Sequence, residues 1–345
     1  MGGSALGRPT PRLPRDVYTQ VVAELKIRLV PKFYKTVEEP RSFVSKISFG
    51  DVDLLASGPQ RTFEPMEELG STENKQNGNI KHFDYQGYQI DIIETDEALM
   101  ELARFFYGYG DTGMIMGMFL RNIGLKFGIS GLTYKCETYK IKLSQDLKAI
   151  LKFLGLDYGV WEQGFETQED MFRFLESSKY FRPYFFSRNN PEVLELDGQR
   201  RKKGTGVFET PTIWNHEARH RLAERPMFHK WIEYVESLPE SADKVDPEQV
   251  KAAALEAFGK HDEVREVEEG LDLGRRIKTK FNGKLAMAWT EHQVTGRPLG
   301  ELTASFKAVY PLTRLDDMTQ DEIKEAFVKF YHAQRQWIHV RNSSW

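Results

Sequence analysis

Cysteine is almost absent from this sequence, and long hydrophobic runs are missing altogether. Cys136 is the single cysteine among 345 residues, which excludes an internal disulfide framework and a cysteine-based zinc site. No run of about 18 uncharged apolar residues occurs, so we expect no membrane-spanning helix and no membrane partner. A lone thiol fits a reducing compartment, and we therefore expect a cytoplasmic or nuclear location.

The chain also lacks an excess of either charge. Lys and Arg total 48 and Asp and Glu total 51, which gives a formal net charge of −3. This balance leaves a nucleic-acid partner open, because a local basic face binds phosphate whatever the total. One such cluster interrupts a stretch with little periodicity, and we expect it to contact nucleic acid. Its members are Arg200, Arg201, Lys202 and Lys203.

Two regions differ in their apolar patterning. Residues 1–15 are rich in Gly, Pro and Arg, which predicts a flexible arm. Residues 16–143 mix helical and strand-like patterns, whereas 144–345 reads as mainly helical. The sequence therefore predicts an α+β fold with a mixed-sheet domain over 16–143 and a helical C-terminal domain over 144–345.

Within the first domain, three segments carry distinct patterns. Apolar residues recur at helical spacing over 16–34, which predicts a helix. The segment 47–56 is rich in Ile, Val, Leu and Phe and predicts a strand. The segment 80–95 predicts two short strands or a hairpin around Gln86 and Gly87.

Two acids sit in the first predicted strand. Asp51 and Asp53 are two residues apart, so their carboxylates point to the same face of a strand. Two carboxylates on an otherwise apolar strand are costly unless a positive group neutralises them. Magnesium ions would do so, because Mg²⁺ takes carboxylate oxygens, water and substrate phosphates. A D-x-D pair on its own is also common in turns and at strand ends.

A third acid, Asp91, lies in the centre of the second apolar strand of the predicted hairpin. If that strand pairs beside the first, three carboxylates converge. Such a set suits two Mg²⁺ ions, or Mn²⁺ in their place, in an in-line phosphoryl transfer. We therefore predict Asp51, Asp53 and Asp91 as catalytic residues and metal ligands.

The run Gly50-Asp51-Val52-Asp53, followed by a lone acid on a later strand, resembles the signature of the DNA polymerase beta nucleotidyltransferase superfamily. The resemblance implies a palm domain in which Asp51 and Asp53 bind both metals. It implies that Asp91 binds the catalytic metal near the primer hydroxyl. Family members carry Gly-Ser before this strand, and here the aligned stretch holds Ser42, Ser45 and Lys46 instead. By the resemblance, these three residues and Gly50 would bind the nucleotide.

Two further blocks resemble branches of this superfamily. Phe105, Phe106 and Gly108 match the family X polymerase segment that borders the incoming nucleotide. Gly113 and Gly117 stand where that family has polar residues facing the base pair and template. Residues 281–302 resemble the helical tail of CCA-adding and poly(A)-type enzymes. That likeness implies that the region binds an RNA 3′ end. The phosphates would be contacted by the nearby basic residues Arg275, Arg276, Lys278 and Lys280.

A literal H-E-x-x-H match also occurs, with His216, Glu217 and His220. This pattern is typical of zinc proteases, which need a third ligand downstream. The surrounding sequence is basic and aromatic, which favours a solvated or RNA-facing helix.

The sequence as a whole predicts a Mg²⁺-dependent nucleotidyltransferase. It would use a nucleoside triphosphate, extend a nucleic-acid 3′ hydroxyl and release pyrophosphate, with an RNA acceptor slightly favoured over DNA. A family X-like DNA polymerase, a non-catalytic nucleotide-binding module, and a transferase acting on a protein or small molecule are the alternatives.

Overall fold

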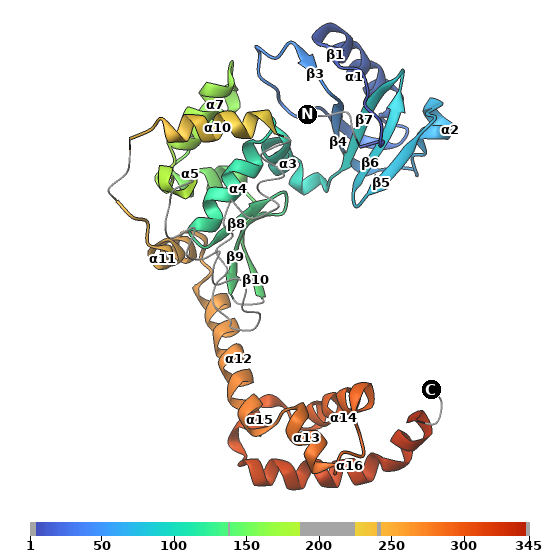
Figure 1. Cartoon of the computed structure of the whole chain (residues 1–345), viewed down its shortest axis with the longest axis vertical. Helices are drawn as coiled ribbons and strands as arrows, with labels where there is room; N and C mark the ends of the chain where they lie inside the picture. Colours follow the sequence, from blue (N-terminus) through green and yellow to red (C-terminus); the bar gives the residue numbers. More distant parts are fainter. Residues whose placement is uncertain (1–4, 137–138, 187–224, 240–242, 343–345) are drawn as a thin grey trace. The chain divides into compact units, whose positions relative to one another are not determined.

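A computed structural model describes residues 5–136, 139–186, 225–239 and 243–342 of the chain. The chain forms two compact units, residues 1–260 and 261–345. The fold is mixed α+β, with a mixed sheet and a helical C-terminal region (Figure 1). No helix among the described residues is both long enough and apolar enough to cross a membrane.

A five-stranded sheet organises the first part of unit 1. Its order is β2-β4-β7-β6-β5, in which β4 and β7 run parallel and the other neighbours run antiparallel. The strands are β2 (Tyr34–Glu38), β4 (Val52–Pro59), β5 (Asn74–Asn77), β6 (Ile80–Tyr85) and β7 (Tyr88–Glu94). A separate short pair joins β1 (Leu13–Pro14) to β3 (Ser48–Phe49) in antiparallel register.

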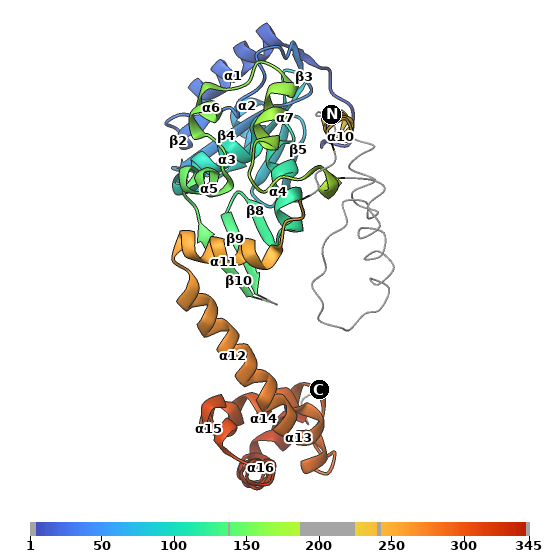
Figure 2. The same cartoon turned by 90° about the vertical axis from the view of Figure 1, so that its left-hand side faces the viewer.

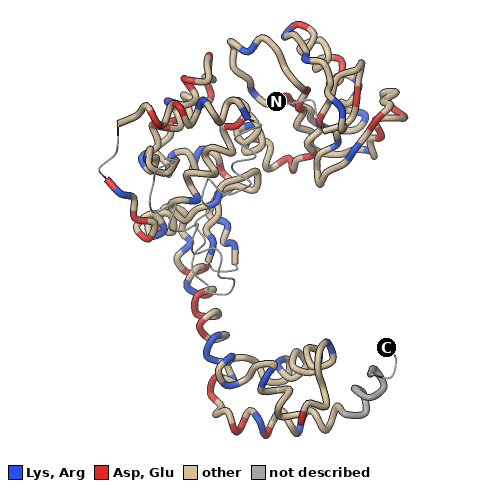
Figure 3. The backbone as a smooth tube through the Cα atoms, in the orientation of Figure 1, with Lys and Arg blue, Asp and Glu red and all other residues tan. Residues whose placement is uncertain are grey.

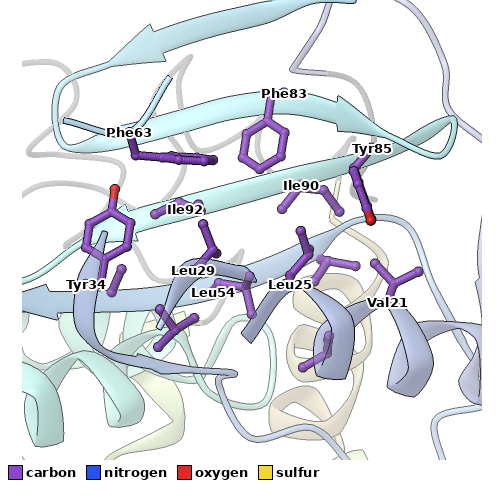
Figure 4. Packing of buried hydrophobic residues seen from close by; sticks show 14 of the residues in the cluster. Val21, Leu25, Leu29, Tyr34, Leu54, Phe63, Phe83, Tyr85, Ile90 and Ile92 are labelled. Carbon is purple, nitrogen blue, oxygen red and sulfur yellow. The ribbon is translucent and has the colours of Figure 1, made fainter. Parts of the chain in front are cut away.

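One face of this sheet is apolar and packs on α1 (Arg15–Leu29). Val21, Leu25 and Leu29 recur at helical spacing and are buried. Figure 4 shows them against the strand residues Leu54, Ile90 and Ile92. The helix ends before Val30, which is extended because it precedes Pro31. The predicted helix over 16–34 is therefore confirmed, with an earlier end.

The β6–β7 connection confirms the predicted hairpin. Gln86 and Gly87 form a two-residue turn with φ values of 52° and 84°. Positive φ at both positions is typical of the type I′ turn, whose twist matches that of paired strands. The predicted strand over 47–56 is divided into β3 and β4 by a bend at Gly50 and Asp51. Short elements α2 (Pro65–Leu69) and β5 lie between β4 and β6.

The rest of unit 1 combines helices with a three-stranded antiparallel sheet of order β10-β9-β8. The strands are β8 (Leu125–Gly128), β9 (Gly131–Cys136) and β10 (Tyr139–Ser144). The helices are η1 (Glu97–Leu99), α3 (Met100–Tyr107), α4 (Thr112–Asn122), α5 (Leu147–Leu154), α6 (Tyr158–Gln163), α7 (Gln168–Glu176), η2 (Pro183–Phe186), α10 (Pro226–Glu236) and α11 (Pro247–Phe258).

Unit 2 is helical. Its helices are α12 (His261–Lys280), α13 (Gly283–Trp289), α14 (Gly296–Val309), α15 (Leu312–Asp317) and α16 (Gln320–Asn342). Figure 2 shows α13 to α16 gathered beside the end of α12. Their core is aromatic, with Phe281, Phe306 and Phe327 fully buried and in mutual ring contact.

Two boundaries differ from those predicted. Residues 13–14 of the expected flexible arm pair with β3, and Leu13 is fully buried in the core. The arm thus has a packing position that its Gly and Pro content conceals. The chain divides at residue 260 rather than at 143, because α5, α11 and β10 contact one another within unit 1.

Two glycines with positive φ, Gly87 in a turn and Gly131 at the start of β9, provide a test of this fold. Gly87 has positive φ and open space around it, whereas a Cβ on Gly131, with φ of 97°, would lie 2.2 Å from the Ser144 carbonyl oxygen. We expect G87A to lower the free energy of unfolding by about 1 kcal/mol through backbone strain alone. G131A adds a steric clash with backbone and should cost about 2–4 kcal/mol. Denaturant titration measures both values, and equal losses would contradict the close approach of Gly131 to the Ser144 carbonyl.

Candidate active site

The parallel pairing of β4 and β7 places Asp53 directly opposite Asp91. Register partners in a pair of strands share a face of the sheet, so Asp53 and Asp91 lie on the face that α1 does not cover. Asp51 lies in the bend before β4, close enough to Asp53 for the two charges to interact. Asp51 and Asp53 are half-buried, and Asp91 is 8% exposed. The two acid-bearing strands thus pair as neighbours, which is the arrangement that the predicted carboxylate site requires.

Two neighbouring side chains contact the Asp91 carboxylate. Gln89 Nε2 donates to Oδ1 at 2.9 Å and to Oδ2 at 3.2 Å. His82, the register partner of Asp91 on β6, places Nδ1 2.8 Å from Oδ1, although this contact is not aligned as a hydrogen bond. Both neighbours are buried, so the position of the Asp91 carboxylate is restrained by contacts inside the protein.

The carboxylates perturb one another. Burial raises the pKa of Asp53 well above its ordinary value, and the charges of Asp51 and Asp91 raise it further, while Lys46 opposes them. Burial also raises the pKa of Asp91; contact with His82 lowers it, Asp51 raises it, and Gln89 lowers it. Burial raises the pKa of Tyr107, and Asp53 raises it further. These shifts indicate a concentration of negative charge that favours a proton or a cation.

The donor set fits a divalent cation in chemistry and charge. Carboxylate oxygens are the ligands that Mg²⁺ prefers, and a cation would relieve the repulsion that raises these pKa values. As the side chains stand, no three His, Cys, Asp or Glu groups in the described ranges converge tightly enough to enclose one ion. The fit therefore rests on the charge of the three acids and on their mutual electrostatic interaction.

The loop before β3 carries the predicted nucleotide-binding residues Ser42, Ser45, Lys46 and Gly50. The loop has no regular secondary structure around these residues, and the donors of Ser45 already have a protein partner. The Ser45 amide and hydroxyl both donate to the Glu166 carbonyl oxygen, at 3.1 and 2.8 Å. Ser42 is half-buried and Gly50 is buried. A phosphate that used Ser45 as a donor would have to displace these bonds.

Lys46 belongs to a cationic group beside the acids. Its Nζ lies 4.2 Å from the centre of the Phe49 ring, and the Arg15 guanidinium lies 5.6 Å from the same ring. Burial lowers the pKa of Lys46, while Asp53 and Asp51 raise it and Arg12 and Arg15 lower it. None of these three cations forms an ion pair within the described part of the chain. Their charge is thus available to an anionic ligand.

Arg15 also holds the loop in place. Its Nε donates to the Lys46 carbonyl oxygen at 2.8 Å, and its Nη2 donates to those of Phe43 and Val44 at 2.7 and 3.0 Å. Arg12 donates to Ser48 through Nε and Nη2. These bonds position both guanidiniums next to the strand that leads to Asp51.

The aromatic–glycine block occupies a different environment from the one expected. Phe105 is fully buried, with its ring 4.6 Å from that of Trp161 and 5.6 Å from that of Phe127. No surface of this ring is left for a nucleotide, because α3 buries it in the core. Phe106 is half-buried. A Cβ on Gly108 would lie 2.6 Å from the Arg104 carbonyl oxygen, which gives this glycine a packing role.

The predicted basic cluster at the end of α12 has internal partners. Arg276 forms a bidentate pair with Asp316, with Nη2 2.7 Å from Oδ2, and Arg275 pairs with Asp272. Lys280 donates to the carbonyl oxygens of Asp316 and Met318. Lys278 is exposed. Figure 3 shows acids along the start of α12 and bases at its end.

Two sets of predicted residues lie outside the described residues. They are the cluster Arg200, Arg201, Lys202 and Lys203, and the H-E-x-x-H residues His216, Glu217 and His220.

Four residues of this site were not predicted from the sequence: His82, Gln89, Arg12 and Arg15. The first two had a usable signal, because a two-residue turn at Gln86 and Gly87 pairs residue 82 with residue 91 by counting back from it. Arg12 and Arg15 were not predicted as site residues, because residues 1–15 were expected to form a flexible arm. Only the pairing of β1 with β3 brings them beside the loop.

A scan against protein-family models finds no match to this chain, and a search of curated proteins finds none either.

The raised pKa of Asp53 makes a prediction about stability. A carboxyl whose pKa is raised by folding stabilises the native state while protonated and loses that contribution as pH rises through the folded-state pKa. D53N should therefore stabilise the cation-free protein by about 1–2 kcal/mol at neutral pH, and the gain should vanish near pH 4. Thermal unfolding in EDTA across this range measures the effect. A destabilised D53N at neutral pH would contradict the assigned environment.

Asp84 is the matched control, on the neighbouring strand β6. Burial acts to raise its pKa, but donors from Glu73, Ser71 and Thr72 outweigh it and lower the pKa overall. A lowered pKa stabilises the fold above the unfolded-state value, and the contribution is lost as pH falls. D84N should therefore destabilise by about 1–3 kcal/mol at neutral pH, the opposite sign to D53N.

Proposed function

We propose that this chain is a Mg²⁺-dependent nucleotidyltransferase of the DNA polymerase beta superfamily type. It would transfer a nucleoside monophosphate from a nucleoside triphosphate to a hydroxyl group and release pyrophosphate. The observation that carries the proposal is the parallel pairing of β4 with β7, which sets Asp53 opposite Asp91 with Asp51 beside them.

Asp51, Asp53 and Asp91 would hold the divalent cations. Bound there, Mg²⁺ would supply activation of the attacking hydroxyl and charge stabilisation of the phosphates. Asp91 would lie nearest the attacking hydroxyl by the family resemblance. The neighbouring sheet supports this role, because a rigid strand pair fixes the spacing of the carboxylates.

The cations Lys46, Arg12 and Arg15 supply the complementary charge. A triphosphate brings several negative charges to a place already occupied by three carboxylates, so positive side chains are needed nearby. Lys46 interacts with Asp53 and Asp51, which puts it within electrostatic reach of both. Arg15 contributes by positioning the loop that carries Lys46.

The acceptor we favour is a nucleic-acid 3′ end, with RNA ahead of DNA. Support comes from the likeness of residues 281–302 to CCA-adding enzymes and from the exposed basic side chains near the end of α12. A family X-like DNA polymerase is less well supported, because Phe105 packs in the core rather than lining an open site. A non-catalytic nucleotide-binding module would need no intact set of acids, yet all three acids lie together.

The direct test is incorporation of labelled nucleotide. Purified protein would be incubated with Mg²⁺, each NTP or dNTP, and three acceptors: single-stranded RNA, a tRNA and a gapped DNA duplex. We expect extension of an RNA acceptor, and D53N and D91N should each reduce it by at least about 100-fold, because an amide cannot replace an anionic metal ligand. The control is D157N, since Asp157 caps α6 far from the acids in sequence and Asn caps a helix equally well.

Two results would contradict the proposal. Extension by D53N at the wild-type rate would remove the metal assignment. Tight nucleotide binding with no extension of any acceptor would favour the non-catalytic module.

The acceptor assignment makes a separate prediction for unit 2. If the exposed basic side chains at the end of α12 contact RNA phosphates, the plot of log affinity against log salt concentration should become less steep in R275Q/K278Q. We expect its slope to change by about 0.7 for each lost contact. Arg276 is left intact, because its pair with Asp316 joins α12 to α15. K329Q is the control, since Lys329 lies on α16 and pairs with Glu325. An unchanged slope in R275Q/K278Q would exclude these two basic side chains from the RNA interface.

A further inference from the structure

Gln89 is a buried amide whose two ends face different partners. It lies on β7 two residues before Asp91, on the same face of the sheet, and it is 2% exposed. Its Nε2 contacts both carboxylate oxygens of Asp91, at 2.9 and 3.2 Å. Its Oε1 accepts a hydrogen bond from the Ala5 backbone N–H at 2.8 Å. Both ends of the amide are therefore occupied.

The Ala5 contact determines which way the amide points. A backbone N–H can only donate, so the group that faces it must be the Gln89 oxygen. That leaves the NH₂ group for Asp91, which can accept from it. Rotating the amide by 180° would set its oxygen against a carboxylate and its NH₂ against an N–H, and the hydrogen bonds to Asp91 and from Ala5 would all be lost.

The segment that carries Ala5 is attached to the same unit at several points. Lys75 Nζ donates to the Ala5 carbonyl oxygen at 3.5 Å, and Arg8 Nε lies 3.0 Å from Glu73 Oε1. Arg12 donates to Ser48, and Leu13 pairs with Phe49. Residues 5–14 thus have defined contacts with β3, β5 and β7, and the Ala5 N–H is not a loose end.

A neutral amide suits this position. Lys or Arg in place of Gln89 would also orient the Asp91 carboxylate, but its charge would repel a divalent cation. The glutamine donates without cancelling the negative charge that the cation requires. Metal-binding carboxylates commonly have hydrogen-bond partners that orient them without contacting the metal. Loss of such a partner typically weakens metal binding or activity by about 10–100-fold.

We propose that Gln89 is a positioning residue for the Asp91 carboxylate, and that the Ala5 N–H fixes its orientation, so that the N-terminal segment is a working part of the active site. This inference rests on the proposed function, because it takes Asp91 as a cation ligand. It assigns to the expected arm a role that depends on one backbone N–H.

The first test is Mn²⁺ binding to the full-length chain without nucleotide, measured by EPR of free Mn²⁺. Q89L removes the donor while keeping a side chain of similar size, and we expect its Mn²⁺ dissociation constant to rise by about 10–100-fold. Transfer activity should fall in kcat with KM for the nucleotide unchanged. A folded Q89L with wild-type Mn²⁺ affinity would overturn the role of Gln89.

A5P tests the orientation without touching the sheet, because proline has no N–H. We expect weaker Mn²⁺ binding in the direction of Q89L and by a smaller factor, while A5G, which keeps the N–H, should bind as the wild type does. Wild-type affinity in A5P alongside an impaired Q89L would overturn the part assigned to Ala5. This variant also serves if Q89L fails to fold.

The proposed function can fail separately. If D91N binds Mn²⁺ as tightly as the wild type, Asp91 is not a ligand, and both the function and this inference are wrong. If D91N loses binding and nucleotide transfer while Q89L and A5P keep both, the function stands and only the positioning role is removed.

Discussion

The parallel pairing of β4 with β7 is the constraint on which the rest of the candidate site depends. It sets Asp53 opposite Asp91, and the bend before β4 places Asp51 close enough to Asp53 for their charges to interact. Every other feature of the site is arranged around that pair. His82 and Gln89 hold Asp91 from β6 and β7, and Lys46 approaches Asp53 from the loop before β3.

The two faces of the sheet have opposite effects on stability. The face against α1 buries Leu54, Ile90 and Ile92 and stabilises the fold through the hydrophobic effect. The opposite face gathers carboxylates whose raised pKa values show that their charged forms are disfavoured. A cluster of carboxylates that destabilises the cation-free fold is typical of a site that serves ligand binding rather than stability.

Patterning in the sequence was sufficient where local rules decide the structure. The hairpin at Gln86 and Gly87 and helix α1 follow from spacing and turn chemistry. It was insufficient where distant segments meet. Nothing local indicates that residues 13–14 pair with β3, that Glu166 occupies the donors of Ser45, or that Phe105 is buried under Trp161. The contact of Ala5 with Gln89 joins residues 84 positions apart and has no local signal.

Calorimetry of Mn²⁺ binding, in buffers of different ionisation enthalpy at about pH 6, tests the central claim most directly. Because burial and neighbouring carboxylates raise the pKa values of Asp53 and Asp91, a proton and a cation compete for these groups, and cation binding releases any proton that the site holds. The account predicts a heat of binding that changes with the buffer, and an affinity that rises with pH. Binding whose heat is independent of the buffer, or the same affinity in wild type and D53N, would contradict a cation site built on this strand pair.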